Sequence, residues 1–229
     1  MPTSAPHKLG VAGASGRLGS RLVELARQAG WTVSLMVSRR AGWRIEAPPQ
    51  VVVDVSHPDA LSEVAAYCAR ESVALVSATS GLQERDLLEL RALAAKVPVV
   101  RAANLSLGHY LQTEALAAVA RALAGRGGVR GAEVRVVDRH PATKHDRPSA
   151  TAIQLAALWR DHGGEAVVES LRHGLPVADH QVGWAFEGEE LVIEHRVLDR
   201  AAAARGALAA ASWALGRPPG LATMNDVYR

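Results

Sequence analysis

Short apolar runs alternate with amphipathic stretches over the first hundred residues, and this alternation constrains the fold more than any other feature of the chain. An apolar run at 9–12 ends at Gly13, and a glycine-rich turn leads into residues 20–29, whose apolar side chains recur at helical spacing. Gly30 closes that helix. Strands that alternate with helices build a parallel sheet with helices on both faces. We therefore expect an α/β fold that begins with a Rossmann-like, doubly wound parallel sheet.

The rest of this first region repeats the pattern. Further strands are expected at 31–37, 51–55, 73–77 and 98–100, and helices at 59–70 and 83–96. Small polar residues follow three of these strands, namely Ser56, Thr79 and Asn104. Because ligands bind at the carboxyl ends of the strands in open parallel sheets, we expect these side chains at a nucleotide site.

The glycine-rich turn Gly13-Ala-Ser-Gly-Arg-Leu-Gly19 is typical of a pyrophosphate-binding loop. Gly13 permits a tight turn, Gly16 lets a pyrophosphate approach the backbone, and Gly19 lets helix and strand pack closely. The free N–H groups at the start of the next helix favour an anion. We expect a dinucleotide to contact Gly13, Ser15, Gly16, Arg17 and Leu18. The alternative is a tight turn without a ligand.

The residues after the second strand bear on which dinucleotide is bound. A site selective for NAD usually has an acidic residue here, to hold the ribose 2′-hydroxyl. This chain has Ser38-Arg39-Arg40 instead. Because a guanidinium can pair with a 2′-phosphate, Arg39 and Arg40 favour NADPH, with NADH still possible. The alternative is a pair of arginines in solvent.

Beyond residue 104 the pattern changes. Helices are expected at 108–124 and 149–161, and the first is broken by Gly125-Arg-Gly-Gly128. Strands are expected at 132–137, 166–171, 180–186 and 191–197, and hairpin turns between them indicate an antiparallel or mixed sheet. A helix at 201–215 and a Pro-rich tail complete the chain. We expect a dinucleotide-binding domain at 1–104, to which 206–229 return, and an α+β domain at 105–205 for substrate binding and oligomerisation.

A polar cluster at 138–152 is the candidate for catalysis, and it is expected to be a loop that leads into a helix. His140 suits proton transfer, because the usual histidine pKa, about 6.5, lies near neutral pH. Lys144, Ser149 and Thr151 suit the binding of an anionic ligand at the start of the helix. The alternatives are a histidine in a surface loop and a serine that only caps the helix.

The order of these motifs resembles the dihydrodipicolinate reductase family of lysine biosynthesis over nearly the whole chain. The stretch Asp54-Val-Ser-His-Pro58 is similar to the family's Asp-Phe-Thr-x-Pro, Ala78-Thr-Ser-Gly81 to its Gly-Thr-Thr-Gly, and Ala102-Ala-Asn-Leu-Ser-Leu-Gly108 to its Asn-Phe-Ser-x-Gly. The segment His195-Arg-Val-Leu-Asp-Arg200, Gly206, Trp213 and Met224-x-Asp-Val227 resemble its closing region. The resemblance adds Asp54, Ala78, Ser80 and Leu105 to the expected cofactor contacts.

The family's signature, His-His-x-x-Lys-x-Asp-x-Pro-Ser-Gly-Thr-Ala, aligns with His140-Pro-Ala-Thr-Lys144-His-Asp-Arg-Pro-Ser149-Ala-Thr-Ala152. The resemblance implies that His140 is the proton donor, that Lys144 serves catalysis and holds the substrate, and that Ser149, Ala150 and Thr151 bind its carboxylate. Pro141 replaces the second histidine, and Ala150 replaces the glycine. Both substitutions lie at positions that the resemblance assigns to the substrate side of the site. The implied reaction is the NADPH-dependent reduction of 4-hydroxy-tetrahydrodipicolinate.

Parts of the sequence suggest three other functions. A reductase of specialised metabolism would keep NADPH and His140 but reduce a different cyclic imine or unsaturated acid. A regulator would bind NADPH without catalysis, although His140 and Lys144 argue against it. A short-chain dehydrogenase needs Tyr-x-x-x-Lys, and neither Tyr67 nor Tyr110 is followed by that lysine.

Composition sets the remaining expectations. The net charge is +3, but the basic residues are scattered, so we expect a carboxylate or dicarboxylate substrate and no nucleic-acid partner. Cys68 is the only cysteine, which excludes an intrachain disulfide and favours the cytoplasm. No apolar run is long enough to span a membrane, and no cluster of residues has metal-ligand spacing. The uncovered sheet of the second domain and the family resemblance favour a homotetramer.

Overall fold

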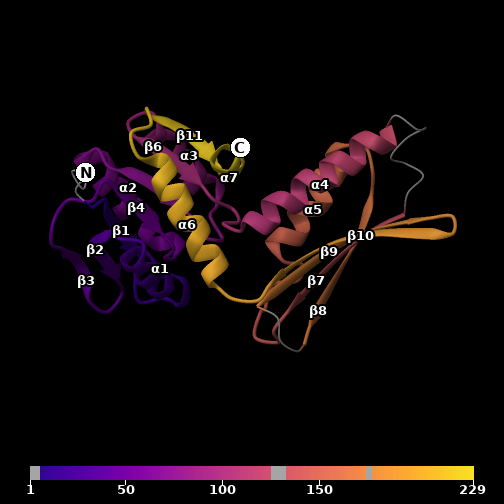
Figure 1. Ribbon diagram of the computed structural model, residues 1–229. Coiled ribbons are helices and arrows are strands. Elements are labelled where there is room, and N and C mark those ends of the chain that lie inside the picture. The colour runs from indigo at the N-terminus through magenta and orange to yellow at the C-terminus, as the bar shows by residue number, and fades with distance from the viewer. Residues whose placement is uncertain (1–5, 125–132, 174–176) are drawn as a thin grey trace, which may run out of the picture. The chain divides into compact units, whose positions relative to one another are not determined.

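The computed structural model describes residues 6–124, 133–173 and 177–229, and the chain divides into two compact units (Figure 1). The first unit contains residues 1–106 and 200–229, and the second contains 107–199. The predicted helix break at 125–128 lies outside the described residues. No helix in the described ranges is long and apolar enough to cross a membrane.

The first unit is built on a seven-stranded sheet in the order β11-β6-β5-β4-β1-β2-β3. Every neighbouring pair is parallel except β2 and β3. The strands are β1 (Lys8–Ala12), β2 (Thr32–Ser38), β3 (Gly42–Ile45), β4 (Val51–Asp54), β5 (Ala74–Ser77), β6 (Pro98–Arg101) and β11 (Gly220–Thr223). The helices are α1 (Arg17–Gln28), the 3-10 turn η1 (Pro58–Ala60), α2 (Leu61–Glu71), α3 (Glu84–Ala94), α6 (Ala201–Ala214) and α7 (Met224–Tyr228). The predicted doubly wound α/β sheet is confirmed.

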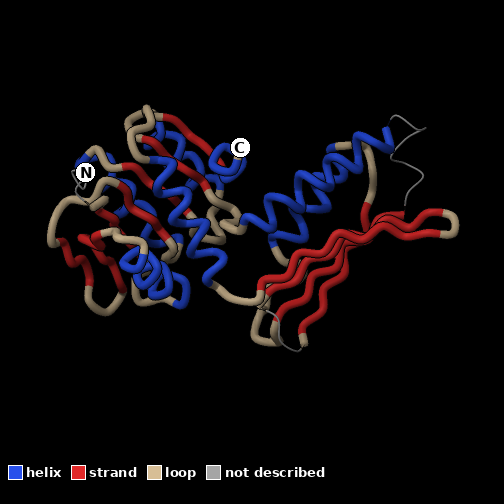
Figure 2. Tube along the Cα trace, in the orientation of Figure 1, coloured by secondary structure: helices blue, strands red, loops and turns tan. Residues whose placement is uncertain are grey.

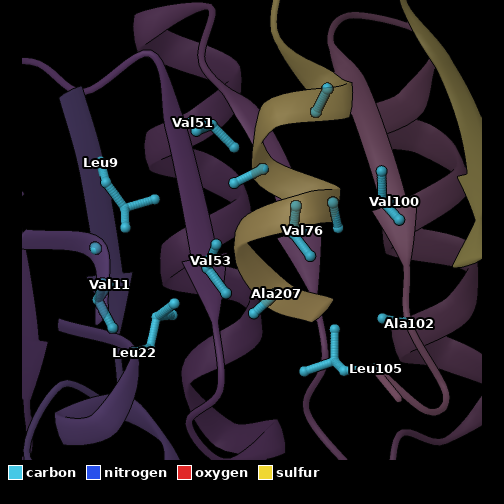
Figure 3. Close-up of a cluster of buried hydrophobic side chains, with 14 of the residues drawn as sticks. Leu9, Val11, Leu22, Val51, Val53, Val76, Val100, Ala102, Leu105 and Ala207 are labelled. Atoms are coloured by element: carbon cyan, nitrogen blue, oxygen red, sulfur yellow. The ribbon is translucent and has the colours of Figure 1, made fainter. Parts of the chain in front are cut away.

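Helices cover both faces of this sheet because the strands are apolar on both sides. One core cluster joins the sheet to α1 and α6, where alanines of α6 allow close packing (Figure 3). Figure 3 shows Leu9, Val53, Val76 and Ala207 in this layer. A second cluster joins the opposite face to α2 and α3.

Two elements of the first unit differ from the expectation. The strand β3 was not predicted, and it pairs antiparallel with β2 through a hairpin that contains Arg39 and Arg40. The segment expected to be only a Pro-rich tail contains β11 and α7, and β11 pairs parallel with β6. Both strands are short edge strands with largely exposed side chains, so they lack the apolar pattern that marks the central strands.

The second unit contains two helices and a four-stranded mixed sheet in the order β10-β9-β7-β8. Its elements are α4 (Leu107–Ala124), β7 (Glu133–His140), α5 (Ala150–Asp161), β8 (Ala166–Arg172), β9 (Ala178–Phe186) and β10 (Glu189–Val197). Only β7 and β8 are parallel. Figure 2 shows α4 and α5 on the same side of this sheet. Trp159 and Trp184, whose ring centroids are 5.8 Å apart, fill the core between helices and sheet.

The predicted loop at 138–152 is wrong at its start, because residues 138–140 belong to β7. The inward side chains of this strand change from apolar Val134 and Val136 to polar Asp138 and His140. Pairing with β8 and β9 continues through Arg139, and with β8 through His140. Because these side chains are polar, the sequence does not indicate a strand here, although the backbone pairs with the neighbouring strands.

Candidate functional site

The glycine-rich turn of the first unit leaves space where a side chain would block it. Gly13 has φ +81°, and a Cβ there would lie 2.7 Å from the carbonyl oxygen of Val55. A Cβ at Gly19 would collide with the carbonyl oxygen of Gly13. The helix α1 begins directly after Gly16, no side chain caps it, and its first turn contains no acidic residue. This end of α1 therefore suits a pyrophosphate.

A pocket of about 490 Å³ opens beside this turn. Predicted cofactor residues Gly13, Ser15, Gly16, Arg39 and Ser56 line it. Its position against Arg39 and Ser38, after the second strand, is where the 2′ side of a dinucleotide ribose is bound in this type of fold. The residues present therefore fit the adenosine half of NADP or NAD.

The pocket also contains residues that the sequence analysis did not select. Trp43, from the unpredicted strand β3, lines it, and its ring packs against Tyr67 of α2 with 5.1 Å between centroids. His57 and Glu63 line it as well, and neither is among the predicted cofactor residues. The sequence gives no sign of this role for Trp43, because no motif contains it and the hairpin that brings it to the pocket was not predicted.

The remaining predicted cofactor residues lie outside this pocket lining. Asp54 is fully buried, and its carboxylate accepts hydrogen bonds from Ser56 through the backbone N–H (3.0 Å) and the hydroxyl (2.5 Å). Burial raises the pKa of Asp54 against these bonds. This pair shapes the turn after β4.

The other predicted cofactor residues that lie outside the pocket lining are Arg17, Leu18, Arg40, Ala78, Thr79, Ser80, Asn104 and Leu105.

Two of these residues have clear structural contacts. Asn104 accepts a hydrogen bond from the N–H of Ser106 (2.9 Å), which fixes the turn after β6. Leu105 is buried in the core, and its carbonyl oxygen accepts a hydrogen bond from the Tyr228 hydroxyl (2.8 Å). The Leu105 side chain therefore packs inside the first unit.

In the second unit, His140 ends β7 and is almost completely enclosed, with 6% of its surface exposed. Its Nδ1 lies 3.1 Å from a carboxylate oxygen of Asp138. Burial lowers the pKa of His140, the charge of Lys144 lowers it further, and Asp138 acts in the opposite direction. The imidazole is therefore neutral near pH 7 in the free protein.

His180 connects His140 to the start of α5. The two imidazoles meet edge to face with 5.1 Å between centroids, and Nε2 of His180 lies 3.4 Å from the hydroxyl of Ser149. That hydroxyl also accepts a hydrogen bond from the N–H of Ala152, so Ser149 is the N-cap of α5, as predicted. Burial and the neighbouring histidines lower the pKa of His180 to about 3. His180 is thus a neutral partner between the two predicted site residues.

The loop between β7 and α5 places Lys144 at the edge of this cluster. The N–H of Lys144 donates to the carbonyl oxygen of Pro141 (3.0 Å), so Pro141 begins a turn. The ammonium lies 2.8 Å from Asp146, and 31% of the lysine side chain is exposed. Arg172 donates to the carbonyl oxygen of Asp146 (2.6 Å) and ties the loop to β8. The cation is therefore held near His140 yet accessible to a ligand.

Ala150 and Thr151 occupy the first turn of α5. Ala150 is exposed and Thr151 is half-buried. The first backbone bond of this helix runs from the N–H of Ile153 to the carbonyl oxygen of Ser149 (3.0 Å). Ala150 and Thr151 therefore lie where helix N–H groups and the dipole favour a carboxylate.

Sequence reasoning missed the residues that reach this cluster from other strands. They are Ser170, Arg172, His180 and His195, and Asp138 joins them from β7 itself, two residues before His140. His180 pairs across the sheet with both Asp138 and His195, so one row of the ladder is polar. The only sign of this row in the sequence is a histidine, His180, on an amphipathic strand. The pairing of the strands has to be known before that histidine can be placed beside Asp138 and His195.

The chain matches two sequence models of one family. The model described as dihydrodipicolinate reductase, N-terminus, matches residues 7–105, and the model described as dihydrodipicolinate reductase, C-terminus, matches residues 108–228. A 4-hydroxy-tetrahydrodipicolinate reductase of Xanthomonas campestris pv. campestris (strain B100) is 33% identical over 241 residues, covering 98% of this chain and 99% of that protein. Its counterpart in Thermosipho africanus (strain TCF52B) is 33% identical over 223 residues, covering 97% and 98%.

A solved structure supports the same relationship at the level of the fold. The dipicolinate-bound dihydrodipicolinate reductase from Paenisporosarcina sp. TG-14 has a TM-score of 0.77 to this chain. The likeness covers 95% of this chain and 97% of that one, at 17% sequence identity.

Proposed function

The chain belongs to the dihydrodipicolinate reductase family, and we propose that it reduces 4-hydroxy-tetrahydrodipicolinate to tetrahydrodipicolinate in lysine and diaminopimelate biosynthesis. It is an NAD(P)H-dependent oxidoreductase by this membership. The relatives that carry the name of this activity align with it over almost their whole length. The observation that supports the activity most directly is the enclosed His140, with Lys144 at its edge and the first turn of α5 beside it.

We propose NADPH as the preferred cofactor. The bound cofactor supplies a hydride to the substrate. Gly13, Ser15 and Gly16 would hold the pyrophosphate, and Arg39 would pair with the 2′-phosphate through its guanidinium. Arg40 and the residues after β4, β5 and β6 would complete the cofactor site. NADH would lose the pairing with the 2′-phosphate and would bind more weakly.

On the substrate side, this chain's residues bind one carboxylate and deliver one proton. Lys144 and the first turn of α5, with Ser149, Ala150 and Thr151, would hold a carboxylate and draw electron density toward it. The substrate becomes more negative when the hydride arrives, so an acid must supply a proton. His140 would provide it from its imidazole ring. Burial of the ring excludes water from this transfer.

The test is NADPH oxidation, followed by its absorbance, with the lysine-pathway substrate generated in situ. We expect turnover by the unmodified protein and a loss of about 10²-fold or more in kcat/KM for Lys144→Ala, because a charge contact to the carboxylate is removed. His145→Ala is the matched control, since His145 is the exposed neighbour of Lys144. Equal rates for the Lys144 variant and the unmodified protein would remove Lys144 from the site.

A second candidate function rests on Pro141 and Ala150, which replace the family's second histidine and glycine. A related reductase of specialised metabolism would act on a different cyclic imine or unsaturated acid. Oxidation of NADPH by such compounds, with no turnover of the lysine-pathway substrate, would favour it. Tight binding of NADPH with no turnover of any imine would instead indicate a regulator.

We also propose a homotetramer assembled through the open face of the second unit's sheet. This face presents exposed Val167 and Val192 beside a network of ion pairs. Arg139 bonds to Asp179 (3.2 Å) and Glu194 (3.4 Å), and Arg196 lies 2.9 Å from Glu194. Light scattering gives the mass in solution, and a monomer at micromolar concentration would contradict the proposal.

We propose the cytoplasm as the location. The support is chemical: Cys68 is the only cysteine, so the chain can form no internal disulfide, which is usual for proteins of a reducing compartment. Fractionation of the cells that make the protein tests this assignment.

A further inference from the structure

A fully buried ion pair lies next to His140, on the Nδ1 side of its ring. The side chains of Asp138 and Arg172 have no exposed surface, and their closest charged atoms are 2.9 Å apart. The same carboxylate oxygen of Asp138 lies 3.1 Å from Nδ1 of His140. Its other oxygen accepts a hydrogen bond from the hydroxyl of Ser170. Both oxygens of Asp138 are therefore engaged, and the carboxylate has a fixed orientation.

The register of two neighbouring strands produces this arrangement. In the parallel pair of β7 and β8, Asp138 is opposite Ser170 and His140 is opposite Arg172. The side chains of Ser170, Arg172 and His140 all end in groups that bond to the Asp138 carboxylate. The strand backbones determine these positions, and Arg172 also donates a hydrogen bond to the carbonyl oxygen of Asp146 in the neighbouring loop.

The engaged carboxylate dictates the protonation of His140. An ionised carboxylate can only accept hydrogen bonds, so Nδ1 of His140 must carry hydrogen to bond to Asp138. In neutral His140 the second nitrogen, Nε2, is then without hydrogen, and in the charged ring Nε2 holds the proton that can leave. A carboxylate behind a working imidazole holds its tautomer and orientation in other enzyme families as well.

Arg172 helps to keep the Asp138 carboxylate ionised. Burial acts to raise the pKa of Asp138, but the hydrogen bond from Ser170 and the charge of Arg172 outweigh it and hold that pKa below its usual value. The carboxylate thus stays ionised. Burial of the ring and the charge of Lys144, with a smaller contribution from Arg172, outweigh the effect of Asp138, so the pKa of His140 is lowered despite its carboxylate neighbour. Asp138 therefore orients the ring, and its tendency to raise the pKa of His140 is offset by these other groups.

We propose that Asp138, fixed by Ser170 and Arg172, is a positioning residue that holds His140 with Nδ1 protonated and Nε2 as the nitrogen that gives its proton to the substrate. Asp138 acts through His140 and keeps its own charge throughout. The proposal rests on the proposed role of His140 as the acid of the reductase.

The test compares Asp138→Asn with the unmodified protein by ¹⁵N NMR of histidine-labelled samples, in solution or by magic-angle spinning for a large assembly. The His140 signals are assigned from their loss in His140→Gln. We expect hydrogen on Nδ1 of neutral His140 in the unmodified protein. In Asp138→Asn the Nε2-protonated form should appear, because an amide can donate to a bare Nδ1. The same tautomer in both proteins would overturn the proposal.

Steady-state kinetics provide the second measurement. We expect Asp138→Asn to lower kcat by about 10²-fold or more, the usual contribution of a positioned acid, with KM for the substrate changed by less than about threefold. NADPH affinity should be unchanged. Asp86→Asn is the matched control, since Asp86 is also buried and paired with an arginine but lies in the first unit.

The outcomes separate this proposal from the proposed function. A changed tautomer with unchanged kcat would overturn the positioning role in catalysis. Undiminished turnover by His140→Gln would count against the assigned acid itself, whatever the tautomer. Ser170→Ala removes one bond to Asp138 but keeps both charges, so it covers the case in which Asp138→Asn does not fold. We expect it to mix the two tautomers and lower kcat by a smaller factor, and an unmixed Nδ1-protonated ring would count against the proposal.

Discussion

At the scale of single residues, the main property of this site is a histidine whose pKa is lowered by burial and by Lys144 in the free protein. His140 is surrounded by one anion, Asp138, and by two cations, Lys144 and Arg172. His180 adds no charge, because its pKa of about 3 keeps it neutral. The balance at His140 is therefore sensitive to any further charge. A dicarboxylate bound at Lys144 would supply that charge.

We predict that binding of a dianion takes up a proton on His140. In the free protein burial and Lys144 lower the pKa of His140, so the ring is neutral near pH 7, and a nearby dianion raises that pKa. Proton uptake on binding is then largest at pH values between the pKa of His140 in the free protein and its pKa in the complex. It vanishes at pH values well below or well above both. Calorimetry of dipicolinate binding in Pipes and in Tris buffers at pH 7 measures it. Uptake that persists in His140→Gln would assign the proton to another group.

The sequence could predict the site residues that share one motif, but not those that meet through strand register. His140, Lys144 and Ser149 lie within ten positions of one another, and spacing in a resembling signature was enough to select them. Ser170 and Arg172 lie about thirty positions further on and reach Asp138 only because β7 and β8 pair in one register. A one-residue shift would have moved both side chains to the other face.

At the scale of elements, the hairpin of β2 and β3 has the clearest functional consequence. It places Arg39 and Trp43 against the same pocket as the glycine-rich turn. The sequence indicated the central strands, because they are apolar throughout. It did not indicate β3, since Gly42, Arg44 and Ile45 are exposed and give no periodic pattern.

We predict that Trp43 contributes to the binding of the adenine end of the cofactor. Stacking of a base on an aromatic ring is worth about 1–3 kcal/mol, so Trp43→Ala should raise Kd for NADPH and for adenosine 2′,5′-bisphosphate alike, by about tenfold. Trp31→Ala is the control, because Trp31 packs against His7 in the same unit and does not line the pocket. If Trp43→Ala lowers Tm but leaves both Kd values unchanged, its role is packing against Tyr67.

At the scale of the whole molecule, the chain leaves the first unit at Ser106 and returns to it at Arg200. The returning segment supplies a core helix, α6, which packs on the sheet beside α1, and a strand, β11. Local pattern alone showed an alanine-rich helix with no indication of which sheet it covers.

We predict that Gly206→Ala destabilises the first unit. A Cβ at Gly206 would collide with the carbonyl oxygen of Leu105, a backbone atom that cannot move away cheaply. Overpacking of this kind costs about 1–3 kcal/mol, which urea denaturation can measure. Gly220→Ala is the control, because a Cβ there meets nothing within 4 Å. Equal midpoints for the two variants would show that α6 shifts freely over the sheet.

The late return of the chain has a consequence for its synthesis on the ribosome. The apolar face of the sheet formed by residues such as Leu9, Val53 and Val76 receives α6 only after the whole second unit has been translated (Figure 3). Until residues 201–214 emerge, α1 is the helix that covers this face, the part that α6 covers is open, and β6 has no β11 beside it. The nascent chain therefore presents an apolar surface for the time that about a hundred residues need, roughly 5–20 s, which makes this interval the one in which chaperones would bind it.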